Sequence, residues 1–215
     1  MKYLKFLGLA AIFAAALTAF AGTASATTLT GSGGTLPAGT EIKSVAEGKT
    51  ILHPPIGDIE CEESTVSGKT SNEGSATETV QGSIESLTFS KCNATVTVLV
   101  KGSLEIHTSY ETVIDEVEGR KVDTRITKTV ADSNGWLTGN GNEVTVEFLG
   151  FHCIFKTNGT PLGKVTGSAN TGGNATLDIE ATIPRTGGRS GVFCGSEAQW
   201  TGSYKVTSPS VLNID

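Results

Sequence analysis

The feature of this 215-residue chain that most limits its fold is a set of short segments in which apolar or β-branched residues occupy every second position. Successive side chains of a β-strand point to opposite faces, so this pattern predicts strands with one buried and one exposed face. Pairs that favour turns, such as Asn158-Gly159 and Gly187-Gly188, stand between the segments. The alternating segments include residues 94–100, 104–110, 122–130, 143–148 and 175–183.

Beyond residue 26, no segment keeps an apolar stripe at the 3.6-residue spacing of a helix. We therefore predict an all-β protein, either an antiparallel β-sandwich or two packed β-sheet units. Trp200 stands close to Cys194 in the chain, and a core tryptophan beside a cystine is common in immunoglobulin-like sandwiches. The predicted sheets accordingly have immunoglobulin-like character, with Trp200 in the core.

The first 26 residues have the form of a secretory signal peptide. Lys2 and Lys5 precede an apolar run that ends in Ala24-Ser25-Ala26, which predicts cleavage after Ala26. The run is shorter than the roughly 20 residues that cross a bilayer, so we expect no membrane span in the mature chain. We expect a secreted protein, extracellular or associated with the cell envelope, with a flexible glycine-rich leader over 27–40 and one β-sandwich domain over 41–215.

Charge and cysteine content narrow the partners and the compartment. The formal charge is −6, and loss of residues 1–26 removes two lysines and no acid, which makes it −8. We therefore do not expect nucleic acid as a partner, because binding it needs a cluster of positive charge on the protein surface. The mature part holds an even number of cysteines, which in an exported chain favours disulfides over free thiols. These cysteines are Cys61, Cys92, Cys153 and Cys194.

The chain contains a weak internal repeat, over residues 49–106 and 143–206. Each half has a cysteine, a strand, a Gly-Lys pair, a longer strand, a second cysteine and a last strand with Gly-Ser. If the halves are equivalent, the economical pairing is Cys61 with Cys92 and Cys153 with Cys194, although four cysteines allow three connectivities. A long hairpin over 104–130, with acids on one limb and bases on the other, is expected to join the halves.

Candidate catalytic and metal-binding residues have simpler structural explanations. His152 and Cys153 are adjacent, so in a strand their side chains diverge and cannot share a proton. The histidines are scattered singly and no zinc-ligand spacing occurs, so we expect no metal and no cofactor. Asp132 to Glu143 matches a calcium loop in length, but Leu137 stands where that loop needs glycine, which favours a hairpin and leaves weak calcium binding as the alternative.

Two further groups of residues are candidates for a ligand or a reaction. Asp58, Glu60 and Glu62 alternate and would share a strand face, as a glycosidase carboxylate pair might, although such acids are common on solvated strands. Exposed aromatic rings on β-sandwich modules bind sugars, and Trp136, which we place in a turn-rich loop, and Tyr110 are the possible ligand contacts. The nearest serine motif, at Gly187, lacks the order of a hydrolase nucleophile.

The C-terminal stretch from Ala181, together with the residues around Leu104 and His152, resembles a set of exported, Thr/Gly-rich, disulfide-bonded proteins of soil actinobacteria. That set has no established function, so the resemblance implies export and a disulfide-bonded β fold and assigns no site residue. We predict a non-enzymatic secreted protein that presents β surfaces to an extracellular protein or glycan. The alternatives are a carbohydrate- or ligand-binding β-sandwich module and a secreted enzyme of unknown reaction.

Overall fold

The computed structural model describes residues 27–55, 57–75, 78–100, 102–108, 112–117, 120–125, 134–189 and 191–215. Over these residues the protein is all-β, as predicted, with two helices of four residues each. None of the helices in this part of the chain is long and apolar enough to cross a membrane. The elements are β1 (Thr27–Gly31), β2 (Gly34–Thr35), β3 (Glu41–Ala46), β4 (Thr50–His53), β5 (Ile59–Thr70), β6 (Gly74–Ser75), β7 (Val80–Cys92), β8 (Thr95–Leu99), β9 (Ser103–Thr108), β10 (Thr112–Val117), β11 (Arg120–Arg125), β12 (Asn134–Asn140), β13 (Glu143–Phe148), β14 (Phe151–Lys156), β15 (Thr160–Thr166), α2 (Ser168–Thr171), β16 (Thr176–Arg189), α3 (Gly191–Cys194), β17 (Glu197–Ser208) and β18 (Asn213–Ile214).

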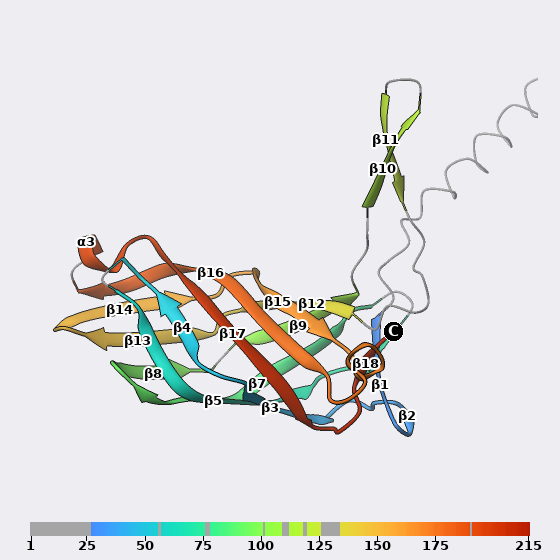
Figure 1. Cartoon of the computed structure of the whole chain (residues 1–215), viewed down its shortest axis with the longest axis horizontal. Helices are drawn as coiled ribbons and strands as arrows, with labels where there is room; N and C mark the ends of the chain where they lie inside the picture. The colour runs from blue at the N-terminus through green and yellow to red at the C-terminus, as the bar shows by residue number, and fades with distance from the viewer. Residues whose placement is uncertain are drawn as a thin grey trace, which may run out of the picture.

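The main sheet has 12 strands, and its hydrogen-bonded pairings close on themselves. From β3 they run through β17, β16, β15, β12, β9, β7 and β5 and return to β3. Every pair in this ring is antiparallel. The two sides of the closed sheet pack against each other, so antiparallel sheets face one another in a sandwich-like arrangement (Figure 1).

The other four strands of the sheet lengthen the body at one end (Figure 1). β4 pairs with both β5 and β17, while β14 pairs with β16, β13 with β14 and β8 with β13. Four strands belong both to the ring and to this extension: β5, β7, β16 and β17. They are 12 to 14 residues long. These four long strands join the two ends of the molecule into one elongated unit.

Large side chains on the inner face of the sheet form the core. Tyr204, Phe155, Val146 and Cys153 are each 0% exposed, and they come from β17, β14 and β13. Burial alternates along β14, where Cys153 and Phe155 point inward and the residues next to them are more exposed. The alternation that predicts strands from the sequence therefore also marks the core.

The segment predicted to be a flexible leader is instead structured, and that prediction is wrong. β1 pairs with β18, β2 and β6, so both ends of the described chain meet in a small sheet beside the ring. Leu29 is 1% exposed and Ile214 is 1% exposed, and both belong to the core. Burial of these side chains outweighs the flexibility that the surrounding glycines suggest.

The predicted long hairpin is shorter in the structure. β10 pairs with β11 from Thr112↔Arg125 to Val117↔Arg120, and this two-stranded sheet stands away from the body in Figure 1. The register sets Glu116 opposite Lys121, as expected for limbs of opposite charge. β9, which was expected to form the start of the hairpin, pairs with β7 and β12 in the ring instead.

The two predicted halves correspond to consecutive parts of the ring. Of the ring strands, residues 49–106 include β5, β7 and most of β9, and residues 143–206 include β15, β16 and most of β17. Each half contains one disulfide, with sequence separations of 31 and 41 residues. Superposition of the halves stays a prediction.

Candidate functional site

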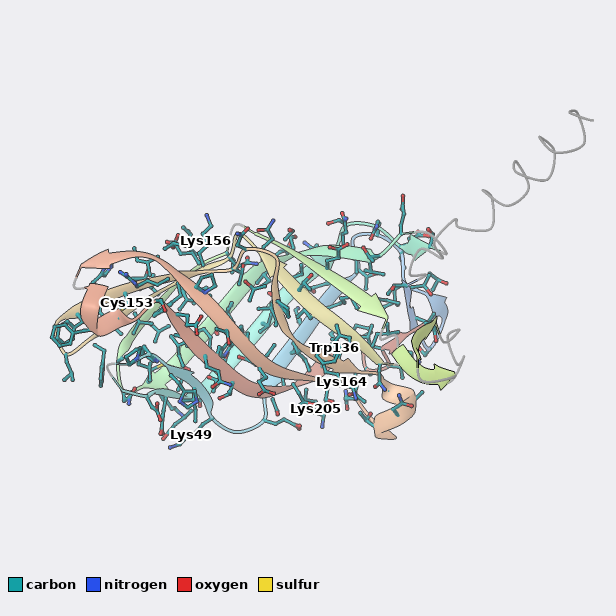
Figure 2. The ribbon with its side chains drawn as sticks, turned by 90° about the horizontal axis from the view of Figure 1, so that it is seen from above. Lys49, Trp136, Cys153, Lys156, Lys164 and Lys205 are labelled. Carbon is teal, nitrogen blue, oxygen red and sulfur yellow. A yellow bond between two sulfur atoms is a disulfide. The ribbon has the colours of Figure 1, made fainter. Side chains whose placement is uncertain are left out.

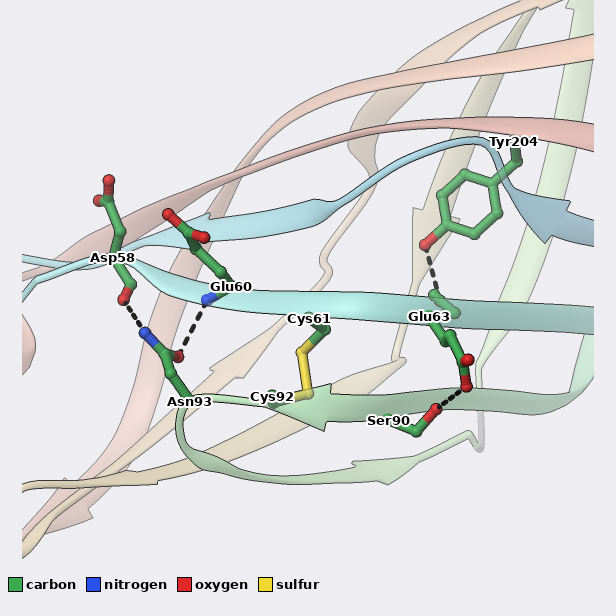
Figure 3. Close-up of a disulfide and its surroundings, with 9 residues drawn as sticks. Asp58, Glu60, Cys61, Glu63, Ser90, Cys92, Asn93 and Tyr204 are labelled. Atoms are coloured by element: carbon green, nitrogen blue, oxygen red, sulfur yellow. Dashed lines mark hydrogen bonds between the residues drawn. A yellow bond between two sulfur atoms is a disulfide. The ribbon is translucent and has the colours of Figure 1, made fainter.

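The two disulfides join the cysteines within each predicted half. Cys61 bonds to Cys92 and Cys153 to Cys194, and neither other connectivity is formed. Cys61 and Cys92 stand opposite each other in the β5–β7 ladder (Figure 3). Cys153 in β14 reaches Cys194 at the end of α3, so this bond ties the helix to the sheet. Both pairs are structural and leave no thiol for catalysis.

The adjacent His152 and Cys153 point to opposite faces of β14, as predicted. Cys153 is fully buried, whereas His152 is only partly buried and stands opposite Glu147 of β13. Because the sulfur is in a disulfide and the two side chains diverge, a reactive His-Cys pair is excluded at this position.

The three acids near Cys61 do not form a carboxylate pair. Asp58 accepts a hydrogen bond from the Nδ1 atom of His53 at 2.8 Å, and Glu60 lies 2.6 Å from the Nζ atom of Lys49. The hydrogen bond to Glu60 raises the pKa of Lys49. Glu62 is exposed. Asp58 and Glu60 are therefore engaged by His53 and Lys49, which accounts for these two acids without a glycosidase mechanism.

Asn93 holds the start of β5 next to the first disulfide (Figure 3). Its side-chain amide donates to the carbonyl of Asp58 at 3.0 Å and accepts from the N–H of Glu60 at 3.0 Å. The Asn93 N–H also donates to the Glu60 carbonyl, at 3.1 Å. These contacts fix the connection that precedes Cys61.

His53 lies between Asp58 and the hydroxyl of Thr201, which is the connectivity of a hydrolytic triad. The Nε2 atom of His53 is 3.4 Å from Oγ1 of Thr201. The side chains of His53 and Asp58 are 34% and 55% exposed, so the group lies on the open sheet face. An oxyanion formed there would be solvated, and fixed donors stabilise it strongly only in a water-excluded site. The contacts tie β4 to β17 and to the turn before β5.

Trp136 is the sequence-predicted ligand contact that the structure describes; Tyr110 lies outside the described residues. We predicted Trp136 in a loop, and this is wrong, because it belongs to β12. Gly135 and Gly139 suggested turns, but both are buried on the inner face of the strand. A Cβ on Gly139 would lie 2.8 Å from Cδ1 of Leu162, so a side chain there would displace the Leu162 side chain. Trp136 itself points outward and is 49% exposed.

Trp136 begins a straight row of outward side chains across four neighbouring strands. It stands opposite Lys164 of β15, which stands opposite Asp178 of β16, which stands opposite Ser203 of β17. All four residues are exposed, and the Ser203 hydroxyl donates to Asp178 at 2.7 Å. With neighbouring strands about 4.8 Å apart, the row is about 14 Å long. We call these four residues the Trp136 row.

Three lysines, two of them near this row, differ from the other four lysines whose side chains are described. Lys43, Lys49, Lys69 and Lys91 each form an ion pair with a glutamate. In the described part of the chain, no carboxylate lies within ion-pair distance of Lys156, Lys164 or Lys205. Figure 2 shows Lys164 and Lys205 close to Trp136, toward the opposite end of the body from Cys153. The ammonium of Lys164 is therefore a hydrogen-bond donor that a ligand can use.

The arrangement combines one flat apolar ring with donors and acceptors in fixed positions. The indole of Trp136 offers an apolar face, Lys164 donates, and Asp178 accepts. The register of the sheet, which the sequence does not reveal, brings these three residues together from three strands. Among the residues described, no group of histidine, cysteine or acidic side chains could hold a metal ion. At the calcium-like stretch, Leu137 is buried in β12 and Asp132 lies outside the described residues.

Comparison with known proteins gives no match to a family, to a curated protein or to a solved structure.

Proposed function

We propose that this protein is a secreted, non-enzymatic binding protein that contacts a carbohydrate outside the cell through the Trp136 row. The observation that carries the proposal is the register of β12, β15 and β16, which aligns Trp136, Lys164 and Asp178 on one exposed face. The signal peptide at residues 1–26 and the two disulfides support export. The resemblance to exported actinobacterial proteins is compatible with this location and adds no activity.

A carbohydrate fits the chemistry of the row better than other ligands do. A pyranose ring has an apolar face of C–H groups that can stack on the indole, and its edge hydroxyls both donate and accept. Lys164 and Asp178 provide the complementary donor and acceptor. The formal charge of −8 in the mature chain disfavours nucleic acid, which needs a positive surface.

The position of the row on the exposed outer face of the sheet favours binding over catalysis. A catalytic site needs groups that converge on a reacting atom, usually in a pocket that excludes water. Asp178 is bonded to Ser203 and lies on an exposed face, where its carboxylate can orient a hydroxyl group. A long polymer can lie across such a face without entering a cleft.

The direct test is a screen of the mature chain, residues 27–215, against glycans. We would use a glycan array together with sedimentation on insoluble cellulose, chitin and peptidoglycan. The proposal predicts saturable binding to at least one glycan and no release of reducing sugar from it. Absence of saturable binding to every glycan would contradict it, and release of reducing sugar would replace binding with an enzymatic function.

A further inference from the structure

The inner face of the ring has a separate feature, a cavity of about 90 Å³ at the end near the termini. Six ring strands, β3, β5, β7, β9, β12 and β17, each contribute an apolar side chain to its wall. These side chains are Ile42, Val66, Val80, Leu104, Leu137 and Val206. Leu212, from the segment before β18, also lines the cavity. The cavity and the Trp136 row lie on opposite faces of β12. Leu137, which lines the cavity, is 6% exposed, whereas the adjacent Trp136 is 49% exposed.

The wall of the cavity is apolar, and two of its polar residues use their polar groups elsewhere. The Thr70 hydroxyl donates to the Pro37 carbonyl at 3.1 Å and accepts from the N–H of Thr40 at 3.1 Å. The Lys69 ammonium is bound to Glu85 at 2.8 Å. A charged or strongly polar ligand would lose its hydrogen bonds to water on entering this cavity. These two residues could not replace them, because their polar groups are already bonded.

The volume of the cavity sets the size of an occupant. An engineered cavity of about 150 Å³ lined by Leu, Ile and Phe stays free of water and binds benzene or xenon. At about 90 Å³, this cavity is smaller and fits xenon or a hydrocarbon of a few carbon atoms. An unoccupied space of this kind costs its lining side chains part of their dispersion contacts, which a ligand of matching shape restores.

The cavity is also accessible to a ligand, because some of its lining side chains are partly exposed to solvent. Ile42, Val66 and Leu104 are only partly buried, although their side chains line it. Leu212, by contrast, is 2% exposed, and its segment is fixed by two hydrogen bonds with Ser168, at 2.8 and 3.0 Å. A ligand can therefore reach the cavity past the partly buried side chains while the terminal segment stays in place.

From the closed ring, the apolar lining and the volume, we infer that the interior is a second binding site, for a small uncharged apolar molecule of the short-hydrocarbon class. This site is independent of the Trp136 row. A ligand of one site therefore leaves the other free.

The test is methyl NMR of the mature protein under increasing xenon pressure. The inference predicts saturable shifts of the methyl groups of Val66, Val80 and Leu104, and unchanged methyl shifts for Val96 and Val144. The latter two line a cavity of about 30 Å³ toward the other end, which serves as the internal control. Shifts that grow linearly with pressure over the whole protein, or saturable shifts at Val96 and Val144 alone, would overturn the inference.

Two variants change the cavity in opposite directions. Val66→Phe fills it, and we expect at least a fivefold weaker apparent affinity for xenon. Leu104→Ala enlarges it, and we expect saturable benzene binding that is at least fivefold tighter than in the wild type. If Val66→Phe does not fold, the benzene affinity of Leu104→Ala is the test. If Leu104→Ala does not fold, the xenon affinity of Val66→Phe is the test. Unchanged affinity in a folded variant would contradict the site.

Discussion

The hydroxyl groups of Ser64 and Tyr204 lie 2.9 Å apart in the interior, although 140 residues separate them in the sequence. Ser64 belongs to β5 and Tyr204 to β17, two of the four long strands that join the ends of the molecule. Both residues are buried, at 3% and 0% exposure. The bond therefore links two strands that do not pair directly along the ring, and it satisfies two polar groups that have no access to water.

Removing one partner of this bond should destabilise the fold. In Tyr204→Phe the Ser64 hydroxyl stays buried without its partner, and we expect a loss of about 1 to 2 kcal/mol in the free energy of unfolding. Urea denaturation measures this value. The exposed hydroxyl pair of Thr65 and Thr88, 2.7 Å apart, is the matched control, and Thr88→Ala should cost less than about 0.5 kcal/mol. Equal losses in the two variants would contradict the role of burial.

Stability should fall at high pH because of the same tyrosine. Burial raises the pKa of Tyr204 from 10.0 to about 12. Between these values the unfolded chain releases the proton and the folded chain keeps it, so the stability present below pH 10 is lost as the pH rises toward 12. The loss amounts to about 2 to 3 kcal/mol at most. Urea denaturation between pH 9 and 12 measures this loss, and the free energy of unfolding should decrease less in Tyr204→Phe than in the wild type. An identical decrease in the two proteins would show that other groups cause it.

The disulfides should each contribute a similar amount to stability. They close loops of 31 and 41 residues, and the loop-entropy relation gives about 4 kcal/mol for each. Replacing both cysteines of one pair by alanine should therefore lower the free energy of unfolding by about 3 to 4 kcal/mol. Urea denaturation of the two double variants measures these losses. A loss below about 1 kcal/mol in either would show that this bond does not restrict the unfolded chain.

Asn93 should be more important than its exposed position suggests. Its amide makes two hydrogen bonds to the backbone before Cys61, with Asp58 and Glu60. Asn93→Ala should cost about 1 kcal/mol, and Asn93→Asp, which keeps an acceptor but loses the donor, should cost less. Thermal unfolding compares the variants. Asn158→Ala is the control, because within the described residues Asn158 forms a hydrogen bond to Thr160 through its backbone N–H and none through its side chain. If both alanine variants melt alike, the two bonds contribute nothing.

The sequence predicts the strands and the disulfides well, because both depend on local patterns. Alternation at residues 143–148 and 175–183 corresponds to β13 and to part of β16. Cysteine count and the repeat lead to Cys61–Cys92 and Cys153–Cys194. Closure of the ring could not be predicted, since it depends on the pairing of β3 with β5 and of β16 with β17, and strand partners are set by the packing of the whole chain.

The candidate site shows the same limit. Trp136 is recognisable from the sequence as a possible ligand contact, but its neighbours Lys164 and Asp178 are 28 and 42 residues further along the chain. Their alignment follows from the register, and a shift of one residue would turn a side chain to the other face. Glycines misled the placement of Trp136, because Gly139 is small for packing against Leu162 and does not form a turn.

The most direct test of the proposed function is the affinity of Trp136→Ala for the glycan found in the screen, measured by titration calorimetry. We expect binding at least about tenfold weaker than in the wild type, because a large aromatic side chain in contact with a ligand often carries much of the affinity. Phe193→Ala is the matched control: Phe193 is also an exposed aromatic, 52% exposed, but stacks on Phe151 away from the row, and its loss should change the affinity less than twofold. Wild-type affinity in Trp136→Ala, with the fold intact, would contradict a role of the Trp136 row in binding.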